Sequence, residues 1–137
     1  MIMKKIFSLL LMILPVAVLT VSCEHKEEDP IIKTTPYSKY KGTWEGTYTG
    51  GDSGVIIYNV NDDGSIIGEI ESDNFPNTDM TLKGKVAIDG TVNIRILYVN
   101  EIDWGGFTGD MTETNATGVW INISANAQGS WVASKVK

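Results

Sequence analysis

The sequence predicts an all-β protein: a single antiparallel up-and-down meander of about eight strands, closed or nearly closed into a small barrel. From Tyr37 onward, apolar and polar residues alternate with a period of two in short runs, and no run there has a helical repeat. Turn sequences separate the runs at close, regular spacing. Gly46, Gly68, Gly84 and Gly109 fall on the apolar side of four runs, where a small barrel needs sharp coiling or close approach of a neighbouring ring.

The first four strands are predicted from alternation and from the turns between them. The first sets Trp44 and Tyr48 on an apolar face, against threonines and a glutamate. The second contains Tyr58, is rich in β-branched residues and ends at an Asp-Gly turn, whose residues tolerate the positive φ of tight hairpins. The third and fourth alternate aliphatic residues with charged ones and threonine, on either side of a polar loop. These strands are predicted at residues 43–49, 55–61, 65–71 and 80–88.

The second half continues the meander. The fifth strand follows another Asp-Gly turn and carries Tyr98 on its apolar face, and a longer loop at 100–106 holds Trp104. The seventh strand contains Trp120, whose facing stays open because three β-branched neighbours compete with it. The last strand contains Trp131 and is predicted to pair with the first, which would remove open edges. These strands are predicted at residues 91–99, 107–113, 118–124 and 129–136.

The chain begins with a predicted signal peptide, residues 1–22. Lys4 and Lys5 precede an apolar run of 16 residues, which is shorter than the roughly 20 residues of a membrane-spanning helix. The only cysteine, Cys23, follows directly.

Residues 19–23 (LTVSC) resemble a bacterial lipoprotein signal. Ser22 matches the small residue that precedes the cysteine, whereas Thr20 stands where these signals usually have leucine. The resemblance implies that Cys23 is lipidated and anchors the mature protein in the bacterial outer membrane, on its periplasmic or cell-surface face.

Residues 23–36 are predicted to be a disordered tether ahead of a barrel domain at 37–137. They are poor in large apolar residues and cannot bury enough surface to fold. The lysine and acidic residues at 26–29 resemble the export signal of surface lipoproteins in the Bacteroidetes group; an ordinary solvated linker is the alternative.

Charge argues against nucleic acid as a partner. The chain has 11 basic and 17 acidic residues, and loss of the leader would remove Lys4 and Lys5 but no acid. The mature chain would therefore carry a net charge of −8 and repel phosphate backbones.

The opening Gly-Thr-Trp at 42–44, the run DDGSIIG at 62–68 and the closing aromatic strand at 129–136 resemble calycin-type up-and-down barrels, the lipocalins and avidins. The likeness implies a barrel fold. The tryptophan-rich strand that avidins use around biotin has no counterpart at 80–99, so the likeness implies no biotin-binding residue. A fold does not fix a function.

No pattern in the sequence indicates catalysis, a metal site or a cofactor. Nucleophilic catalysis lacks a base, because the only histidine, His25, lies in the predicted tether. The oxygen-rich segments 61–63 and 73–79 do not match a calcium loop of the EF-hand type, and the aspartates at 52, 62–63 and 89 are accounted for as turn formers.

Small barrels bind ligands at their mouths, where aromatic and polar groups converge. Inward aromatics commonly fill the interior of so small a barrel, so core packing is the favoured role of those candidates that lie on strands. Trp104, in a predicted loop, instead indicates contact with sugar, lipid or protein. The aromatic candidates are Trp44, Tyr48, Tyr58, Tyr98, Trp104, Trp120 and Trp131.

We therefore expect a lipid-anchored envelope binding module that is not an enzyme and that recognises a small apolar or sugar-like ligand at the barrel mouth. This hypothesis predicts a pocket lined by Trp44 and its neighbours. The alternative is a protein-interaction or inhibitor barrel with a filled core and an exposed Trp104. A second alternative, a carboxylate-dependent hydrolase, needs two inward-facing acids about 5–10 Å apart.

Overall fold

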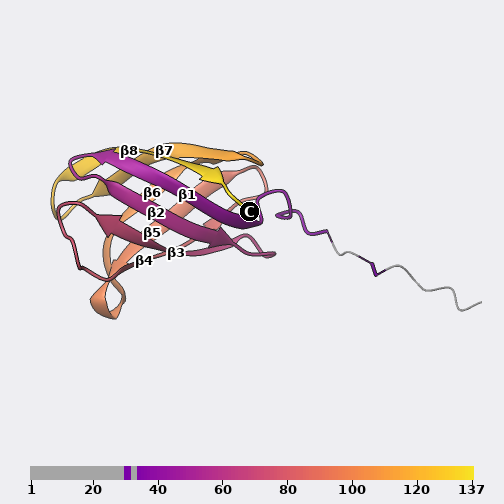
Figure 1. Ribbon diagram of the computed structural model, residues 1–137, viewed down its shortest axis with the longest axis horizontal. Coiled ribbons are helices and arrows are strands. Elements are labelled where there is room, and N and C mark those ends of the chain that lie inside the picture. The colour runs from indigo at the N-terminus through magenta and orange to yellow at the C-terminus, as the bar shows by residue number, and fades with distance from the viewer. Residues whose placement is uncertain (1–29, 32–33) are drawn as a thin grey trace, which may run out of the picture. The chain divides into compact units, whose positions relative to one another are not determined.

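The computed structural model describes Pro30, Ile31 and residues 34–137. Eight antiparallel strands form a closed up-and-down barrel, as predicted (Figure 1). The strands are β1 (Gly42–Gly50), β2 (Gly54–Val60), β3 (Ser65–Ser72), β4 (Met80–Val86), β5 (Thr91–Tyr98), β6 (Ile102–Met111), β7 (Asn115–Asn122) and β8 (Ala127–Lys135), with a short 3-10 helix, η1 (Val99–Glu101), between β5 and β6. Within this described part, no helix has the length and apolar composition needed to cross a membrane.

The first and last strands close the barrel, which confirms the predicted pairing. Tyr48 on β1 lies opposite Trp131 on β8, and Gly46 lies opposite Ala133. Since every strand has two hydrogen-bonded neighbours, none of the eight offers a free edge for another chain to extend.

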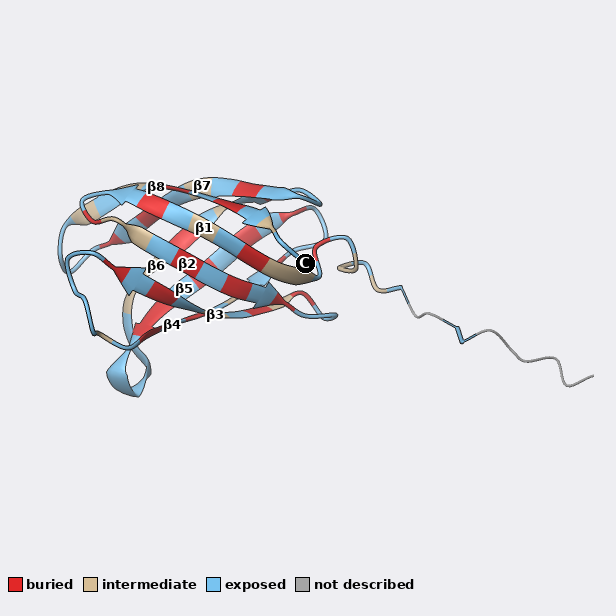
Figure 2. Ribbon diagram, in the orientation of Figure 1, coloured by how far each residue is buried: buried red, intermediate tan, exposed pale blue. Residues whose placement is uncertain are grey.

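The inward side chains pack into one hydrophobic core inside the barrel. Figure 2 shows buried residues recurring along the strands, between exposed ones. Alternation along each strand buries one face and exposes the other, as the sequence predicts. The inward glycines bring neighbouring strands into close approach: a Cβ on Gly68 would lie 2.5 Å from the Cβ of Tyr58, nearer than non-bonded carbons come. The same holds for Gly46, Gly84 and Gly109, where an added Cβ would collide with the next strand. The expected close approach of an aromatic residue is therefore seen at Gly68 alone, whereas at Gly46, Gly84 and Gly109 the neighbouring strand comes close through backbone or alanine atoms.

The two ends of the barrel differ. The entry end holds the turn before β1, the chain's C-terminus and the three tight turns at 61–64, 87–90 and 112–114. There Tyr40 is 2 % exposed, its hydroxyl donates to the carbonyl of Ile88 (3.1 Å), and its own carbonyl accepts from the indole of Trp44 (2.9 Å). Tyr40 therefore closes this end.

The loop end holds the other four connections, at 51–53, 73–79, 99–101 and 123–126. In Figure 1 the connection between β5 and β6 projects beyond the barrel, away from the entry end.

Two strand predictions need correction, and the structure decides the facing of Trp120, which the sequence left open. β6 begins at Ile102, so the expected loop at 100–106 is mostly strand, and Trp104 lies on β6. Trp120 on β7 faces inward and is 1 % exposed, while its β-branched neighbours Val119 and Ile121 face outward. Tyr98 was expected on an inner face but is 41 % exposed, because the register shift between Ile96 and Leu97 turns Leu97 inward (3 % exposed) and the next residue outward.

Candidate functional site

Five of the seven aromatic candidates lie inside the barrel. Trp44, Tyr48, Tyr58, Trp120 and Trp131 are each at most 1 % exposed. None of the five lines either of the two surface hollows described below. The interior that could have formed a ligand pocket is therefore filled by its own rings.

The three buried indoles have their polar atoms engaged. The Nε1 of Trp120 donates to the carbonyl of Thr49 (2.9 Å), and the Nε1 of Trp131 donates to the carbonyl of Thr108 (3.0 Å). Trp44 bonds to the turn before β1, as described above. Because each bond ends on backbone of another segment, the rings are held in place and their donors are not available to a ligand.

Edge-to-face contacts complete this packing. The ring of Tyr48 meets those of Phe107 and Trp120 with centroids 5.6 and 5.4 Å apart, and Phe107 meets Trp131 at 5.8 Å. Such pairs contribute about 0.5–1.5 kcal/mol each beyond area burial. The centre of the barrel is thus a cluster of aromatic rings that pack edge-to-face across strands.

Tyr58 is the exception among the polar groups of this cluster. Its ring stacks on Trp44, with centroids 6.2 Å apart and planes 3° apart, but its hydroxyl is buried without a hydrogen-bond partner. Burial raises the pKa of the Tyr58 phenol above its ordinary value, so the group stays neutral. With the amide nitrogen of Asn122, it is one of two such buried atoms in the described residues.

Asp52 sits beneath the loop end as a buried carboxylate. It is 4 % exposed, and its Oδ2 accepts hydrogen bonds from the hydroxyls of Tyr48 (2.9 Å) and Ser72 (2.7 Å). Its Oδ1 accepts from the backbone amides of Ser53 (2.8 Å) and Asn74 (3.3 Å). Four donors from three segments satisfy the carboxylate, so Asp52 ties the β1–β2 turn to the end of β3.

A β-bulge shapes the hairpin of β5 and β6. Ile96 lies opposite Gly105, but the next residue, Leu97, lies opposite Asp103. Trp104 is therefore an extra residue with no partner across the ladder. A bulge bends its strand and re-aims side chains. The half-buried ring of Trp104 meets that of Phe75 edge-on, with centroids 5.7 Å apart.

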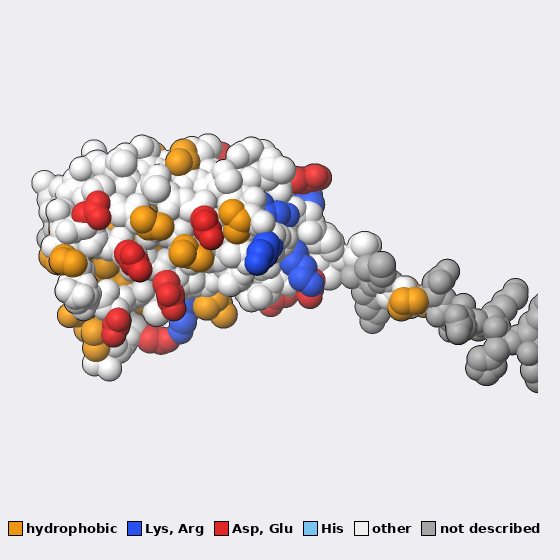
Figure 3. Space-filling model, viewed as in Figure 1, with side chains coloured by type: hydrophobic (Ala, Val, Ile, Leu, Met, Phe, Trp, Pro, Cys, Tyr) orange, Lys and Arg blue, Asp and Glu red, His pale blue; other side chains and the backbone are white. Residues whose placement is uncertain are grey.

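Beyond the bulge, the hairpin tip exposes apolar side chains. Tyr98, Val99 and Ile102 are 41, 48 and 60 % exposed. Asn100 and Glu101, between them, both have left-handed backbones, with φ of 61° and 60°. Non-glycine residues rarely adopt that conformation, and it concentrates at functional sites. Figure 3 shows hydrophobic side chains gathered at the loop end near this hairpin.

Two ion pairs flank the tip on the outer face of the barrel. Lys83 on β4 pairs with Glu101, which lowers the pKa of that carboxyl below its ordinary value, chiefly through their hydrogen bond. Arg95 on β5 pairs with Asp103 on β6 at 2.9 Å. All four side chains are at least half exposed, so each pair contributes at most about 1 kcal/mol.

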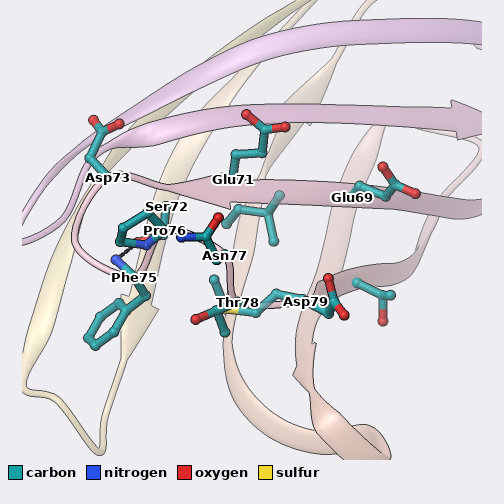
Figure 4. A pocket seen from close by; sticks show the side chains of 12 residues that line it. Glu69, Glu71, Ser72, Asp73, Phe75, Pro76, Asn77, Thr78 and Asp79 are labelled. Atoms are coloured by element: carbon teal, nitrogen blue, oxygen red, sulfur yellow. Dashed lines mark hydrogen bonds between the residues drawn. The ribbon is translucent and has the colours of Figure 1, made fainter.

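A hollow of about 690 Å³ lies beside this hairpin, between β3 and the 73–79 loop. Figure 4 shows the carboxylates of Glu69 and Glu71 rising from β3, with Phe75 on the loop. Asp73 and Asp79 also line the hollow, and its lining includes no lysine or arginine. It is therefore an acidic groove on the outside of the barrel.

A second hollow, of about 390 Å³, lies over the outer face of β5, β6 and β7. It is lined by Trp104, Ile121 and Ile123, together with the Arg95–Asp103 pair. Of the seven aromatic candidates, only Trp104 lines either of the two hollows.

The described residues form no group of three or more His, Cys, Asp or Glu side chains that could hold a metal ion. The turn aspartates act as expected: Asp63 and Asp89 accept from the backbone amides of Ser65 and Thr91, at 2.9 Å each. Hydrogen bonding to the same two residues lowers the pKa of both carboxyls, chiefly through the side chain of Ser65 for Asp63 and through the backbone amide of Thr91 for Asp89.

Sequence reasoning missed two features of the loop end. Asp52 was interpreted only as a turn former, because nothing in the local sequence shows that Tyr48 and Ser72 converge on it. Phe75 was assigned to a polar loop, although an aromatic residue before a proline in such a loop was a signal. Cys23 and His25 lie outside the described residues. Comparisons with known protein families, with characterised proteins and with solved structures find no match for this chain.

Proposed function

We propose that this chain is a non-catalytic binding module of the bacterial envelope that recognises another protein through its outer surface. The filled interior carries this proposal. A barrel that encloses a small ligand needs a cavity, whereas here Trp44, Tyr58 and their neighbours occupy that volume. The apolar side chains open to a partner lie outside the barrel, on loops and on strand faces.

The anchoring part of the proposal rests on the sequence. Lipidation at Cys23 would hold the module at the outer membrane through residues 23–36. Two or more acyl chains give stable anchoring, at about 0.8 kcal/mol for each buried methylene. Metabolic labelling with a palmitate analogue tests this step: we expect label on the wild-type chain and none on Cys23→Ala.

Native mass spectrometry tests whether the module encloses a ligand. A variant beginning at Thr34 keeps all eight strands and the whole core. We expect it to have the mass of the polypeptide alone, and its tryptophan emission to stay unchanged with sugars, fatty acids and haem. A stoichiometric bound molecule that shifts the emission would overturn the proposal in favour of a small-ligand carrier.

One observation keeps a small ligand as the second candidate. The acidic groove beside β3 is large enough for a sugar-sized or amine-containing molecule, and Phe75 offers it a ring face. A ligand bound there would lie outside the barrel, and Phe75→Ala would abolish its binding while Trp44→Phe would not.

A further inference from the structure

The hairpin tip of β5 and β6 projects beyond the barrel and exposes apolar side chains (Figure 1). Its three large side chains, Tyr98, Val99 and Ile102, are each at least 41 % exposed. They cluster on one short connection, with Phe75 (46 % exposed) at the base of the hairpin. Exposed apolar residues scattered singly are ordinary, but a cluster on a protruding loop marks a contact site.

This tip is held in shape before any partner arrives. The bulge at Trp104 packs against Phe75, and the ion pairs of Glu101 with Lys83 and Asp103 with Arg95 brace both sides of the hairpin. A braced loop loses less conformational freedom on binding than a loose one, which favours affinity.

The charges around the tip indicate the chemistry of its partner. The groove beside it presents the four carboxylates of Glu69, Glu71, Asp73 and Asp79. The two basic residues nearest the tip, Lys83 and Arg95, are already paired with acids of the hairpin. An anionic membrane surface would be repelled by this array, whereas lysines and arginines would be attracted to it.

We propose that the tip formed by Tyr98, Val99 and Ile102 inserts into an apolar cleft of a partner protein, and that lysine or arginine residues on the rim of that cleft face the acidic groove. This inference rests on the proposed function, since it names the element that makes the contact. The entry end, where β1 begins, lies at the other end of the barrel from the tip.

Photo-crosslinking of the full chain in its native host tests the proposal. Benzoylphenylalanine replaces Val99 at the tip (48 % exposed), and in a control chain it replaces Ile88 at the entry end, which is somewhat more exposed (57 %). We expect one discrete protein adduct from position 99 and none from position 88. Mass spectrometry then identifies the crosslinked peptide, which we expect to be apolar and flanked by lysine or arginine residues.

Charge variants test the role of the groove. Glu71→Gln with Asp79→Asn should lower the adduct yield at least threefold. Asp110→Asn with Glu113→Gln makes the same change in net charge near the entry end and should leave the yield unchanged. In membrane extracts, we expect the yield to fall about threefold or more between 0.1 M and 1 M salt, because the Debye length shrinks from about 10 Å to about 3 Å.

Several outcomes would overturn this inference: no adduct at position 99, an adduct with phospholipid, an adduct with a second copy of this chain, equal yields at both positions, or a yield insensitive to both charge and salt. None of these outcomes decides the proposed function, which native mass spectrometry tests independently. If the barrel holds no ligand and the tip gives no adduct, recognition through the outer surface stands, but the tip is not the element that makes the contact.

Discussion

The hydroxyl of Tyr48 donates a 2.9 Å hydrogen bond to the Oδ2 of Asp52, so a core aromatic of β1 holds the turn that follows its own strand. The same oxygen accepts from Ser72 at the end of β3. The carboxylate is buried, and Ser72 lies 20 residues from Asp52 in the chain. This junction connects the packed interior to the 51–53 turn and to the 73–79 loop, which lines the acidic groove.

Replacing Asp52 by alanine should therefore destabilise the barrel and loosen its loop end. The change leaves the hydroxyls of Tyr48 and Ser72 buried without an acceptor, which costs about 1–3 kcal/mol for each group. We expect the free energy of unfolding in urea to fall by about 2–4 kcal/mol in total. Asp79→Asn, an exposed acid of the neighbouring loop, is the control and should change stability by less than about 0.5 kcal/mol.

The two buried phenols predict a loss of stability in alkaline solution. Burial is the main cause that raises the pKa of both Tyr48 and Tyr58 above the ordinary value of 10.0. Above that pH the unfolded chain releases these protons while the folded chain keeps them, so unfolding becomes more favourable as pH rises. Each fully retained proton contributes a slope of about 1.4 kcal/mol per pH unit.

The Tyr58→Phe substitution removes one of these two phenolic protons, so it measures the contribution of Tyr58 alone. Because the Tyr58 hydroxyl has no partner, we expect the variant to be as stable as the wild type at pH 7, or more stable by up to about 1 kcal/mol. Above pH 10 its stability should fall less steeply than that of the wild type. Chemical denaturation at pH 7 and between pH 10 and 11 measures both effects, and an unchanged alkaline slope would show that Tyr58 does not hold its proton.

The inward glycines predict a strong position dependence of alanine substitution. A Cβ on Gly68 would overlap β2, at 2.5 Å from the Cβ of Tyr58. Forcing extra atoms into a packed core costs about 1–3 kcal/mol. On Gly106 of β6, the nearest atom to an added Cβ would be 2.9 Å away and the next 3.9 Å. Thermal unfolding of both variants should show the larger loss for Gly68→Ala.

These glycines also show how far the sequence could predict the fold. Alternation and turn residues are local signals, so eight strands, their order and the pairing of β1 with β8 were predictable. The sequence left open which side chains point into the barrel only where both faces of a strand are apolar, as around Trp120 on β7. There the inward side is decided by cross-strand contacts, such as the bond from the indole of Trp120 to Thr49, which no local pattern encodes.

The loop end was less predictable because its features depend on register. The bulge at Trp104 follows from how Ile96 and Leu97 pair across the hairpin, and the adjacent glycines concealed that strand in the sequence. Of the seven aromatic residues selected from the sequence, five lie in the core. Which of them fill the core and which remain accessible depends on the curvature of the closed sheet.

The four tryptophans should accordingly divide into three protected rings and one accessible ring. Trp44, Trp120 and Trp131 are at most 1 % exposed, whereas Trp104 is half-buried beside Phe75. Acrylamide should quench a minor fraction of the emission, and Trp104→Phe should remove that fraction while the quenching-resistant emission remains. Phe75→Ala uncovers one edge of the Trp104 ring, so it should increase quenching and shift the accessible emission to longer wavelength. Ile88→Ala, at the entry end, is the matched control and should change neither. If Trp104→Phe left the quenchable fraction intact, one of the core indoles would have to be accessible, and the filled interior on which surface recognition rests would be contradicted.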